Sequence, residues 1–419
     1  MTNTNGTNGT NGTRHDVLDV LDVLIVGGGP AGSTAANLLA HAGHDVLVLE
    51  KEVFPRFHIG ESLLPIDLPI FERLGVVLDY KDFIRKDGAE FIDERTGATA
   101  TFVFREGLNG TPKNAYQVER SRFDHHLMKQ AEARGAKVRY GVKVEEMTVE
   151  ADHVRVDTTD GVFRARYMVD ATGQDAFLAR ANRTVQPLKG FGCIAVFRHY
   201  DGIAPEIFAE LTESGNIKVL MVPDGWMWLI PLAGPRLSVG IVSRHPMSAP
   251  FETLDEAIAA SPITQRLIAG AAGTEPRIIR NFSYRNRRPY GPRWGCAGDA
   301  SCFLDPVFSS GVSLAMLAGE SLAGKVSAAL RAGTEDNPEL LAEHAKRMEV
   351  GYKTFAGIVY RFYHAELVHR LFFHDTQGQP LRPGITSVLG ADFWRDDNPF
   401  QQMLLNSLTP EAWPEASEP

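Results

Sequence analysis

A glycine triplet near the N-terminus constrains the fold of this chain more than any other feature. Gly27, Gly29 and Gly32 form the pattern G-x-G-x-x-G, directly after the apolar run 23–26 and directly before the segment 31–45, which has helical spacing. The first glycine permits a tight turn, the second lets the backbone approach a pyrophosphate, and the third lets the helix pack closely on the strand. The pattern therefore predicts a strand, a glycine turn and a helix in succession.

The stretch DVLVLEK that follows predicts a second strand, so the opening forms a βαβ unit. Such a unit implies a parallel sheet with a crossover helix. The second strand ends at Glu50, where a carboxylate accepts hydrogen bonds from a ribose hydroxyl, and the helix N-terminus offers free N–H groups to phosphates. These features together predict a dinucleotide site. A plain tight turn is the alternative.

Length, charge and cysteine content narrow the class of protein further. A chain of 419 residues is too long for one ordinary core, which predicts two interlocked domains or one elaborated domain. A net charge of −9 gives no reason to expect nucleic-acid binding. No apolar run has the length of a membrane span, and the N-terminus lacks the pattern of a signal peptide. Three scattered cysteines favour a cytoplasmic protein and argue against a disulfide framework or a metal site: Cys193, Cys296 and Cys302.

Three later stretches identify the dinucleotide. YMVDATGQD runs from an apolar strand into Asp170, Thr172 and Gly173. WGCAGDAS places Gly298 and Asp299 after a short strand, and YQVERSRF carries Arg120. Together with the glycine triplet they resemble the FAD-dependent monooxygenases of the aromatic-hydroxylase superfamily. The resemblance implies that the Gly-Asp carboxylate contacts the ribityl and pyrophosphate part of FAD. A surface arginine at a helix start is the alternative for Arg120.

The positions that match the FAD contacts of that superfamily lie in seven short segments. They are Gly27, Gly29, Pro30, Ala31, Gly32, Glu50, Lys51, Gly60, Glu61, Ser62, Arg120, Asp170, Gly173, Gly298, Asp299 and Gly311. No second glycine-rich fingerprint for a nicotinamide cofactor is present. We therefore expect a separate flavin reductase to supply FADH2, although aromatic hydroxylases bind NADPH without such a fingerprint.

Four further stretches narrow the resemblance to the flavin-dependent halogenases. They are FPRFHIGESLLP at 54–65, KDGAEF at 86–91, WMWLIP at 226–231 and FLDPVFSSGVS at 303–313. The hexapeptide W-x-W-x-I-P is the most specific, because simple hydroxylases of the superfamily generally lack it. With the FAD elements, these stretches cover most of residues 20–330.

The resemblance implies a reaction and a catalytic lysine. Reduced FAD, O2 and chloride or bromide give hypohalous acid, which passes through a tunnel to a lysine that holds it by a hydrogen bond or as a haloamine. Lys86 matches that lysine. A haloamine requires a neutral amine, so we expect burial to lower the pKa of Lys86. A solvated surface charge is the alternative.

The halide site and the partition also follow from the resemblance. Ser310 and Gly311 match the positions whose backbone N–H groups hold the halide at a helix N-terminus, with simple packing against FAD as the alternative. Trp226 and Trp228 point to the same side of one strand. We expect them to form a wall between flavin and substrate, unless the strand merely faces the core. The partition and tunnel residues are Trp226, Trp228, Ile230, Pro231 and Phe308.

Phe308 bears on the substrate. Tryptophan halogenases carry a catalytic glutamate two residues before the Ser/Thr-Gly pair, and this chain has Phe308 there. A phenol or pyrrole needs less help, because its own lone pairs activate the ring, so we disfavour free tryptophan. Many members of the phenol and pyrrole branch act on an acyl group tethered to a carrier protein. A basic stretch is the candidate docking surface, with a solvated face as the alternative: Arg285, Arg287, Arg288 and Arg293.

Two other features are given structural roles. His58, in the loop near the expected flavin, is interpreted as a satisfied structural histidine rather than a catalytic one. The aromatic face of YRFYHAELVHRLFFH is interpreted as helix core and rim rather than a substrate lining.

We expect an α/β fold that combines a Rossmann-like FAD-binding domain of the GR2 type, an interleaved antiparallel-sheet substrate domain and a helical C-terminal region. The expected parts are a disordered low-complexity tail at 1–15, the FAD-binding domain at 16–190 and 281–335 with inserted strands near 88–118, the substrate domain at 191–280, and the helical region at 336–419.

Two rival functions share part of this pattern. An FAD-dependent aromatic hydroxylase or an isoprenoid-type FAD reductase would share the FAD elements, but neither explains W-x-W-x-I-P together with Lys86. A non-catalytic FAD-binding scaffold for a carrier protein would need neither Lys86 nor the Ser310-Gly311 pair. An FADH2-dependent halogenase of an electron-rich aromatic is the function that the whole pattern favours.

Overall fold

The computed structural model describes residues 20–223, 225–364, 366–373 and 381–414. The predicted tail at 1–15 lies outside them. The βαβ opening consists of β1 (Leu21–Val26), α1 (Pro30–His41) and β2 (Val46–Glu50). The helix ends at His41, just before Gly43, which has φ +89°, a left-handed conformation that helical residues do not adopt.

A parallel sheet forms around this opening. Its strands run in the order β20 (Trp294–Cys296), β10 (Gly161–Asp170), β1, β2 and β7 (Lys137–Tyr140), all parallel. Antiparallel strands extend it: β8 (Val144–Val149), β9 (Val154–Thr158) and β19 (Tyr290–Gly291). Helix α1 packs against α3 (Arg120–Ala133) and α8 (Ser310–Ala332). A Cβ at Gly319 of α8 would lie 2.4 Å from the Ala31 carbonyl oxygen, so α1 and α8 are in close backbone contact.

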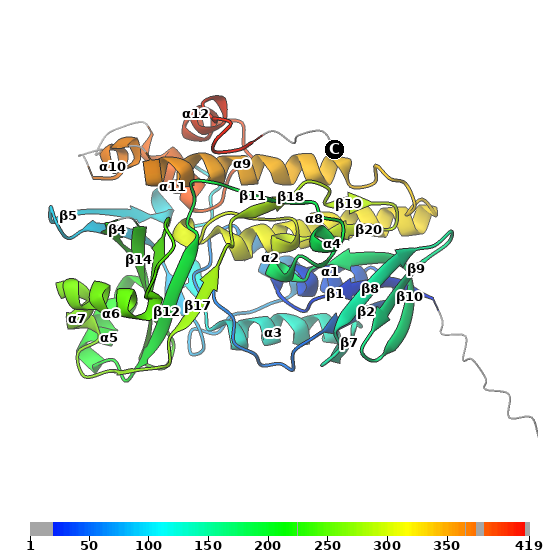
Figure 1. Cartoon of the computed structure of the whole chain (residues 1–419), viewed down its shortest axis with the longest axis horizontal. Helices are drawn as coiled ribbons and strands as arrows, with labels where there is room; N and C mark the ends of the chain where they lie inside the picture. The colour runs from blue at the N-terminus through cyan, green and yellow to red at the C-terminus, as the bar shows by residue number, and fades with distance from the viewer. Residues whose placement is uncertain (1–19, 224, 365, 374–380, 415–419) are drawn as a thin grey trace, which may run out of the picture.

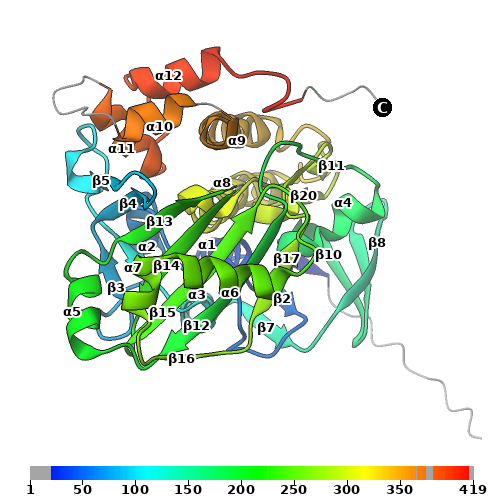
Figure 2. The same ribbon diagram turned by 60° about the vertical axis from the view of Figure 1, so that its left-hand side comes forward.

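A second, mixed sheet lies at the other end of the long axis (Figure 1). Its strand order is β16 (Ala272–Gly273), β12 (Ile194–Asp201), β15 (Arg236–Ser243), β14 (Gly225–Leu232), β13 (Ile217–Val222), β4 (Gly88–Asp93) and β5 (Ala98–Val103), and β17 (Arg277–Arg280) also pairs with β12. Helices α5 (Pro205–Ser214), α6 (Pro250–Ala260) and α7 (Pro262–Leu267) belong to this end, and Figure 2 shows α6 crossing the sheet.

The inserted strands β4 and β5 belong to this sheet. Strand β4 pairs with β13 in parallel, with Val219 opposite Phe91, a pairing that the sequence patterns did not predict. The consecutive strands β13, β14 and β15 are antiparallel, as predicted from their turn signals. Parallel partners are separated by long connections, so nothing local in the sequence identifies them.

Strand β14 separates two cores. Trp226, Trp228 and Ile230 belong to the larger core around the FAD-binding part, whereas Met227 and Leu229 belong to the core beneath α6. This follows from the alternation of side chains along a strand. One strand therefore presents its tryptophans to the interior of the molecule.

The C-terminal helices cover one side of both sheets. Helix α9 (Ala342–His364) packs on α8 and runs above the two ends of the molecule (Figure 1). Helix α10 (Glu366–Phe373) contacts β5, and α11 (Arg382–Leu389) and α12 (Pro399–Asn406) follow. Within the described ranges, no helix is both long enough and apolar enough to cross a bilayer.

Shorter elements connect these layers. They are α2 (Asp67–Leu74), α4 (Phe177–Ala181), the pair β3 (Ile84–Lys86) and β6 (Ala115–Gln117), the small sheet β11 (Val185–Pro187), β18 (Tyr284–Asn286) and β21 (Cys302–Phe303), and the single turns η1 (Phe104–Glu106), η2 (Gly173–Asp175), η3 (Gly298–Ala300) and η4 (Pro306–Phe308).

Candidate active site

A cavity of about 1050 Å³ lies between the parallel sheet and the mixed sheet. Its lining comes from the glycine turn, the loop after β2, the start of α3, the loop after β10, strand β14 and the start of α8. The predicted cofactor residues that line it are Gly27, Gly29, Pro30, Ala31, Glu50, Lys51, Gly60, Glu61, Ser62, Arg120, Gly173, Asp299 and Gly311.

The glycine turn at the N-terminus of α1 has no room for larger side chains. Gly27 has φ +102°, and a Cβ there would lie 2.3 Å from the Ala171 carbonyl oxygen. A Cβ on Gly32 would lie 2.0 Å from the Gly27 carbonyl oxygen. Helix α1 begins at Pro30 with no side-chain cap on its N-terminus. The first turn therefore keeps backbone N–H groups for a phosphate-bearing ligand.

Glu50 and Lys51 border the same cavity. The buried carboxylate of Glu50 accepts hydrogen bonds from the Gly28 N–H at 2.7 Å and the Glu52 N–H at 2.9 Å. Lys51 is exposed and forms an ion pair with Asp175. Glu50 thus braces the glycine turn and also lines the cavity.

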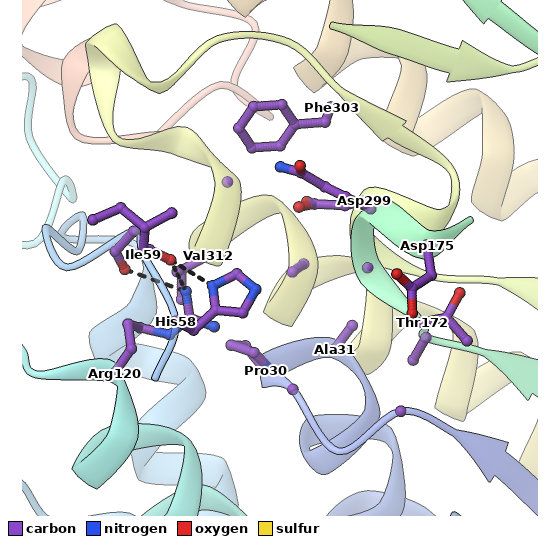
Figure 3. Close-up of a pocket in the computed structure, with 18 of the residues that line it drawn as sticks. Pro30, Ala31, His58, Ile59, Arg120, Thr172, Asp175, Asp299, Phe303 and Val312 are labelled. Carbon is purple, nitrogen blue, oxygen red and sulfur yellow. Dashed lines mark hydrogen bonds between the residues drawn. The ribbon is translucent and has the colours of Figure 1, made fainter. Parts of the chain in front are cut away.

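Arg120 is held in place by a buried carboxylate. Asp124 accepts from Arg120 Nε at 2.7 Å and from Arg56 Nη1 at 2.9 Å. Burial alone would raise the pKa of Asp124, but the two guanidinium groups hold it below its usual value. Arg120 Nη1 also donates to the Ile59 carbonyl at 2.7 Å (Figure 3). Arg120 therefore lies at the cavity and not on the surface.

His58 lies beside Arg120 in this part of the cavity (Figure 3). Its Nδ1 lies 2.6 Å from the Ile59 carbonyl oxygen. Burial and then the nearby Arg120 charge lower the pKa of His58 to about 4, so the ring is neutral at pH 7. This agrees with a hydrogen-bonded structural histidine.

Asp299 lies across the cavity from Pro30 and Ala31 (Figure 3). Burial raises the pKa of its carboxyl group to about 7, and the charge of Arg120 opposes that shift. Thr172, Asp175, Phe303 and Val312 also line the cavity, and the sequence patterns did not single them out as contacts. Thr172 and Asp175 sit in the quoted D-A-T-G-Q-D stretch, which was the available signal.

Three predicted contacts lie outside the lining. The Asp170 carboxylate is buried and accepts from the Thr172 hydroxyl and from two backbone N–H groups, those of Thr172 and Leu178, so it secures the loop after β10. Gly32 and Gly298 act through packing: a Cβ on Gly298 would lie 3.1 Å from the Ala31 Cβ. These three positions shape the cavity instead of facing it.

Trp226, Trp228 and Ile230 form one wall of the cavity, which we call the tryptophan wall. The two indole rings lie 5.8 Å apart between centroids, tilted by 46°. Trp228 Nε1 donates to the Ser238 hydroxyl at 3.1 Å. Pro231 is not part of this wall, because alternation along β14 places it on the opposite face.

A hydrogen-bonded chain ties the tryptophan wall to Asp305, the residue that caps η4. Trp226 Nε1 donates to the Tyr363 hydroxyl at 2.9 Å, and that hydroxyl donates to Asp305 at 2.9 Å. Asp305 also accepts from the Gly192 N–H at 2.8 Å and the Val307 N–H at 3.0 Å. Burial raises the pKa of Asp305 to about 6, and these hydrogen bonds oppose the shift.

Lys86 is 1% exposed, which makes it one of the largest fully buried side chains. Its Nζ donates to the Ser62 hydroxyl at 2.9 Å and to the Leu63 carbonyl at 2.8 Å, and it lies 5.3 Å from the Phe104 ring centroid. Burial lowers the pKa of Lys86 to about 7, and the charge of Asp67 opposes that shift. Ser62 lines the cavity and Lys86 does not, so the amine lies one hydrogen bond behind the lining.

Phe308 belongs to a group that we call the aromatic cluster. Its members are Phe91, Phe102, Phe308, Phe362 and Phe372, with neighbouring ring centroids 4.6 to 6.4 Å apart. None of the five lines the cavity. Phe308 therefore lies among aromatic rings and outside the cavity.

The halide positions meet the cavity at the first turn of α8. Gly311 lines the cavity together with Ser309 and Val312, whereas Ser310 is buried at 3% exposure. No side chain caps the helix here, and Ser309 precedes it in the left-handed conformation at φ +59°. The backbone N–H groups of this turn are thus available to an anion.

Glu61 brings a second ionisable pair to the lining. Its Oε1 lies 2.8 Å from His199 Nε2, and both side chains are buried. The sequence patterns placed Glu61 near the flavin but did not identify this partner, which comes from β12.

Only part of the basic stretch is exposed as a candidate docking surface. Arg285 and Arg293 are both 8% exposed. Arg285 donates to Gln186 and to the Pro414 carbonyl, and Arg293 pairs with Glu335. Two of the four arginines thus serve internal contacts, because their strands are covered by neighbouring segments.

The cavity fits FAD on its own geometry. A glycine turn with no room for a Cβ opens onto an uncapped helix N-terminus, as a pyrophosphate requires. Arg120 and Asp299 face the space beyond it, and the tryptophan wall and Phe303 supply flat apolar surface. The described residues hold no group of three histidine, cysteine, aspartate or glutamate side chains that could bind a metal ion.

Known proteins share this arrangement. A family model described as tryptophan halogenase matches residues 22–112 and 98–400. Tryptophan 2-halogenase of Chondromyces crocatus is 32% identical over 373 residues, which cover 84% of this chain and 70% of the relative. Flavin-dependent halogenase armH3 of Armillaria mellea is 31% identical over 379 residues, which cover 81% of this chain and 73% of the relative.

Solved structures agree with the sequence comparison. The flavoprotein/dehydrogenase from Cytophaga hutchinsonii superposes with a TM-score of 0.84 at 28% identity, covering 94% of this chain and 98% of that one. The flavin-dependent brominase Bmp2 superposes with a TM-score of 0.81 at 27% identity, covering 93% and 98%. The chain therefore belongs to the tryptophan halogenase family and is a flavin-dependent halogenase, an oxidoreductase that uses FAD, O2 and a halide ion.

Proposed function

We propose that this halogenase accepts FADH2 from a separate flavin reductase and transfers oxidised chloride or bromide through Lys86 to an electron-rich phenol or pyrrole. The observation that supports this best is the location of Lys86. Its amine is buried and donates a hydrogen bond to Ser62 of the cavity lining, so Lys86 is not a solvated surface charge. The rival scaffold function gives no reason to bury an amine there.

The chain's own residues divide the work. When bound, reduced FAD supplies the electrons with which O2 and halide yield hypohalous acid. The first-turn N–H groups of α8, at Ser310 and Gly311, hold the halide. With a pKa of about 7, Lys86 is present near neutral pH both as an ammonium that donates a hydrogen bond to hypohalous acid and as an amine that can form a haloamine. The tryptophan wall keeps the cofactor away from the aromatic substrate.

Phe308 supports an activated ring as substrate. It packs against Phe91 and Phe362 at 6.1 and 5.7 Å between centroids, so no carboxylate is present at this position to activate a poorly nucleophilic ring. A phenol or pyrrole activates itself through its oxygen or nitrogen lone pair. The acidic group that tryptophan halogenases carry here is thus unnecessary for the substrate we propose.

We further propose that the substrate is an acyl group tethered to a carrier protein, in secondary metabolism. The branch resemblance at Phe308 supports this part of the proposal, whereas the arginine stretch gives little support because two of its four members are internal. A docking surface elsewhere on the chain would be required.

Product mass tests the proposal. The enzyme, a flavin reductase, FAD and bromide or chloride are incubated with free phenols and pyrroles and with carrier proteins that bear the same acyl groups. We expect halogenated product, and at least about 100-fold less with Lys86→Met, the usual size of a lost acid or base. Lys218→Met is the matched control, because Lys218 is a partly buried lysine that pairs with Glu90 on the mixed sheet. Oxygen insertion without halogen, or full activity of Lys86→Met, would contradict the proposal.

A further inference from the structure

A buried carboxylate near Lys86 has no role in the chemistry described so far. Asp67, the first residue of α2, is 1% exposed. Its Oδ2 accepts from the Ser313 hydroxyl at 2.9 Å and from the Leu64 N–H at 3.2 Å. Its Oδ1 is buried and has no hydrogen-bond partner within the described part of the chain. A half-satisfied buried acid is costly to fold and calls for an explanation.

Asp67 and Lys86 hold the same turn, residues 62–67. Lys86 binds its first two residues through the Ser62 hydroxyl and the Leu63 carbonyl. Asp67 binds the next one through the Leu64 N–H and connects the turn to α8 through Ser313. The amine and the carboxyl group therefore share one buried, hydrogen-bonded framework that also includes Ser62 of the cavity lining.

The two groups are each other's charged neighbour. Burial lowers the pKa of Lys86 to about 7 and raises that of Asp67 to about 7, and each opposite charge opposes the other shift. The other charged side chains on the elements packed around the pair lie at the surface or in ion pairs of their own. They are Arg85 on β3, Glu72 and Arg73 on α2, Arg105 and Glu106 on η1, and Glu320 on α8, which pairs with Arg73.

We propose that Asp67 is a positioning residue that sets the protonation state of Lys86. This inference rests on the proposed role of Lys86. Haloamine formation needs the neutral amine: the nitrogen lone pair takes the halogen, the O–X bond of hypohalous acid breaks, and hydroxide leaves with an amine proton as water. While Asp67 is ionised it favours the ammonium, and when it is protonated it favours the free amine. Asp67 comes from another element than Phe308, so it is not the glutamate of tryptophan halogenases.

The test compares pH profiles of halogenation. Asp67→Asn keeps the shape and an oxygen acceptor but removes the charge. Without that charge the ammonium is less stable, so we expect the limb that Lys86 controls to move to lower pH by about one pH unit, the smallest effect typical of a close opposite charge. Asp67→Glu restores the charge and is expected to move the limb back toward the original value. Asp93→Asn is the matched control, because Asp93 is also fully buried but its carboxylate pairs with Arg95 instead of Lys86.

A second readout does not depend on turnover. The lysine Cε resonances are followed by carbon-13 NMR across the same pH range, and the Lys86 signal is assigned from its loss in Lys86→Met. Its titration midpoint is expected to fall in Asp67→Asn and to stay unchanged in Asp93→Asn. If Asp67→Asn does not fold, Ser313→Ala removes one hydrogen bond that stabilises the charged carboxylate and is expected to cause a smaller movement in the same direction.

The outcomes separate the two proposals. An unmoved Lys86 midpoint in Asp67→Asn, with activity reduced equally at every pH, would show that Asp67 only supports the fold. Full halogenation by Lys86→Met would instead overturn the proposed function, whatever the NMR titration shows.

Discussion

The cavity and the region around Lys86 are built in different ways. The cavity is formed by backbone turns and helix ends, with Gly27 and Gly311 placed where side chains would intrude. The region around Lys86 depends more on side chains: the Ser62 hydroxyl and the Phe104 ring contact the buried amine, together with the Leu63 carbonyl. We propose that the tryptophan wall is the boundary between cofactor and substrate, and the variants below test each part of this contrast.

The largest effect is expected on the backbone side, from Gly32→Val. Its Cβ would lie 2.0 Å from the Gly27 carbonyl oxygen, so the turn cannot close around a pyrophosphate. We expect FAD binding, measured by flavin fluorescence quenching, to be lost. Gly324→Ala is the control, because a Cβ there meets nothing within 4 Å. This helical position is expected to gain up to about 1 kcal/mol of stability. Retained tight FAD binding in Gly32→Val would contradict a backbone-built site.

Removing one tryptophan of the wall should let the aromatic substrate meet the cofactor directly. Trp226→Ala or Trp228→Ala deletes a buried indole and is expected to lower the free energy of unfolding by about 3–5 kcal/mol. We also expect hydroxylated substrate to appear in the product mass spectrum. Trp294→Ala, in the core on the other face of the parallel sheet, is expected to cost similar stability without hydroxylation. If halogenation continues cleanly in both wall variants, the tryptophans only fill the core.

The smallest effect on stability is expected from Tyr363, whose hydroxyl holds Trp226 of the tryptophan wall. Tyr363→Phe leaves Trp226 Nε1 without its acceptor and removes one donor from buried Asp305. We expect a loss of about 1–3 kcal/mol in chemical denaturation, the cost of unsatisfied buried groups. Tyr352→Phe offers a matched contrast, since the buried Tyr352 hydroxyl has no partner within the described residues. That variant should be neutral or slightly stabilising, and equal losses in both would argue against the chain from Trp226 to Asp305.

Local patterns accounted for much of the fold and of the cofactor side. The βαβ opening and the strands β13 to β15 were predicted because apolar periodicity and turn residues act over short distances. The joining of β4 to β13 was not, since it depends on a parallel partner far along the chain. The exclusion of Pro231 from the wall was available from alternation alone. The pairing of Asp124 with Arg120, four residues apart on α3, was also available as a helical charge pair.

Two predicted roles depended on where side chains point. Asp170 was expected at the cofactor, but its carboxylate secures its own loop. Arg285 and Arg293 belonged to a stretch interpreted as a solvated face or a docking surface, but covering segments from other parts of the chain bury them. A residue type shows what a side chain can do, and only its neighbours in space show which option it takes.

The sequence by itself determined the glycine turn, the tryptophan pair on one strand face and a lysine in a halogenase-like setting, because spacing and residue type are local properties. Only the tertiary structure decided that Lys86 is buried beside Ser62, that Asp67 is its charged neighbour, and that Tyr363 anchors Trp226. Those contacts join segments that are distant in the chain. Their pKa shifts and hydrogen bonds arise from burial, which exists only after the layers have packed together.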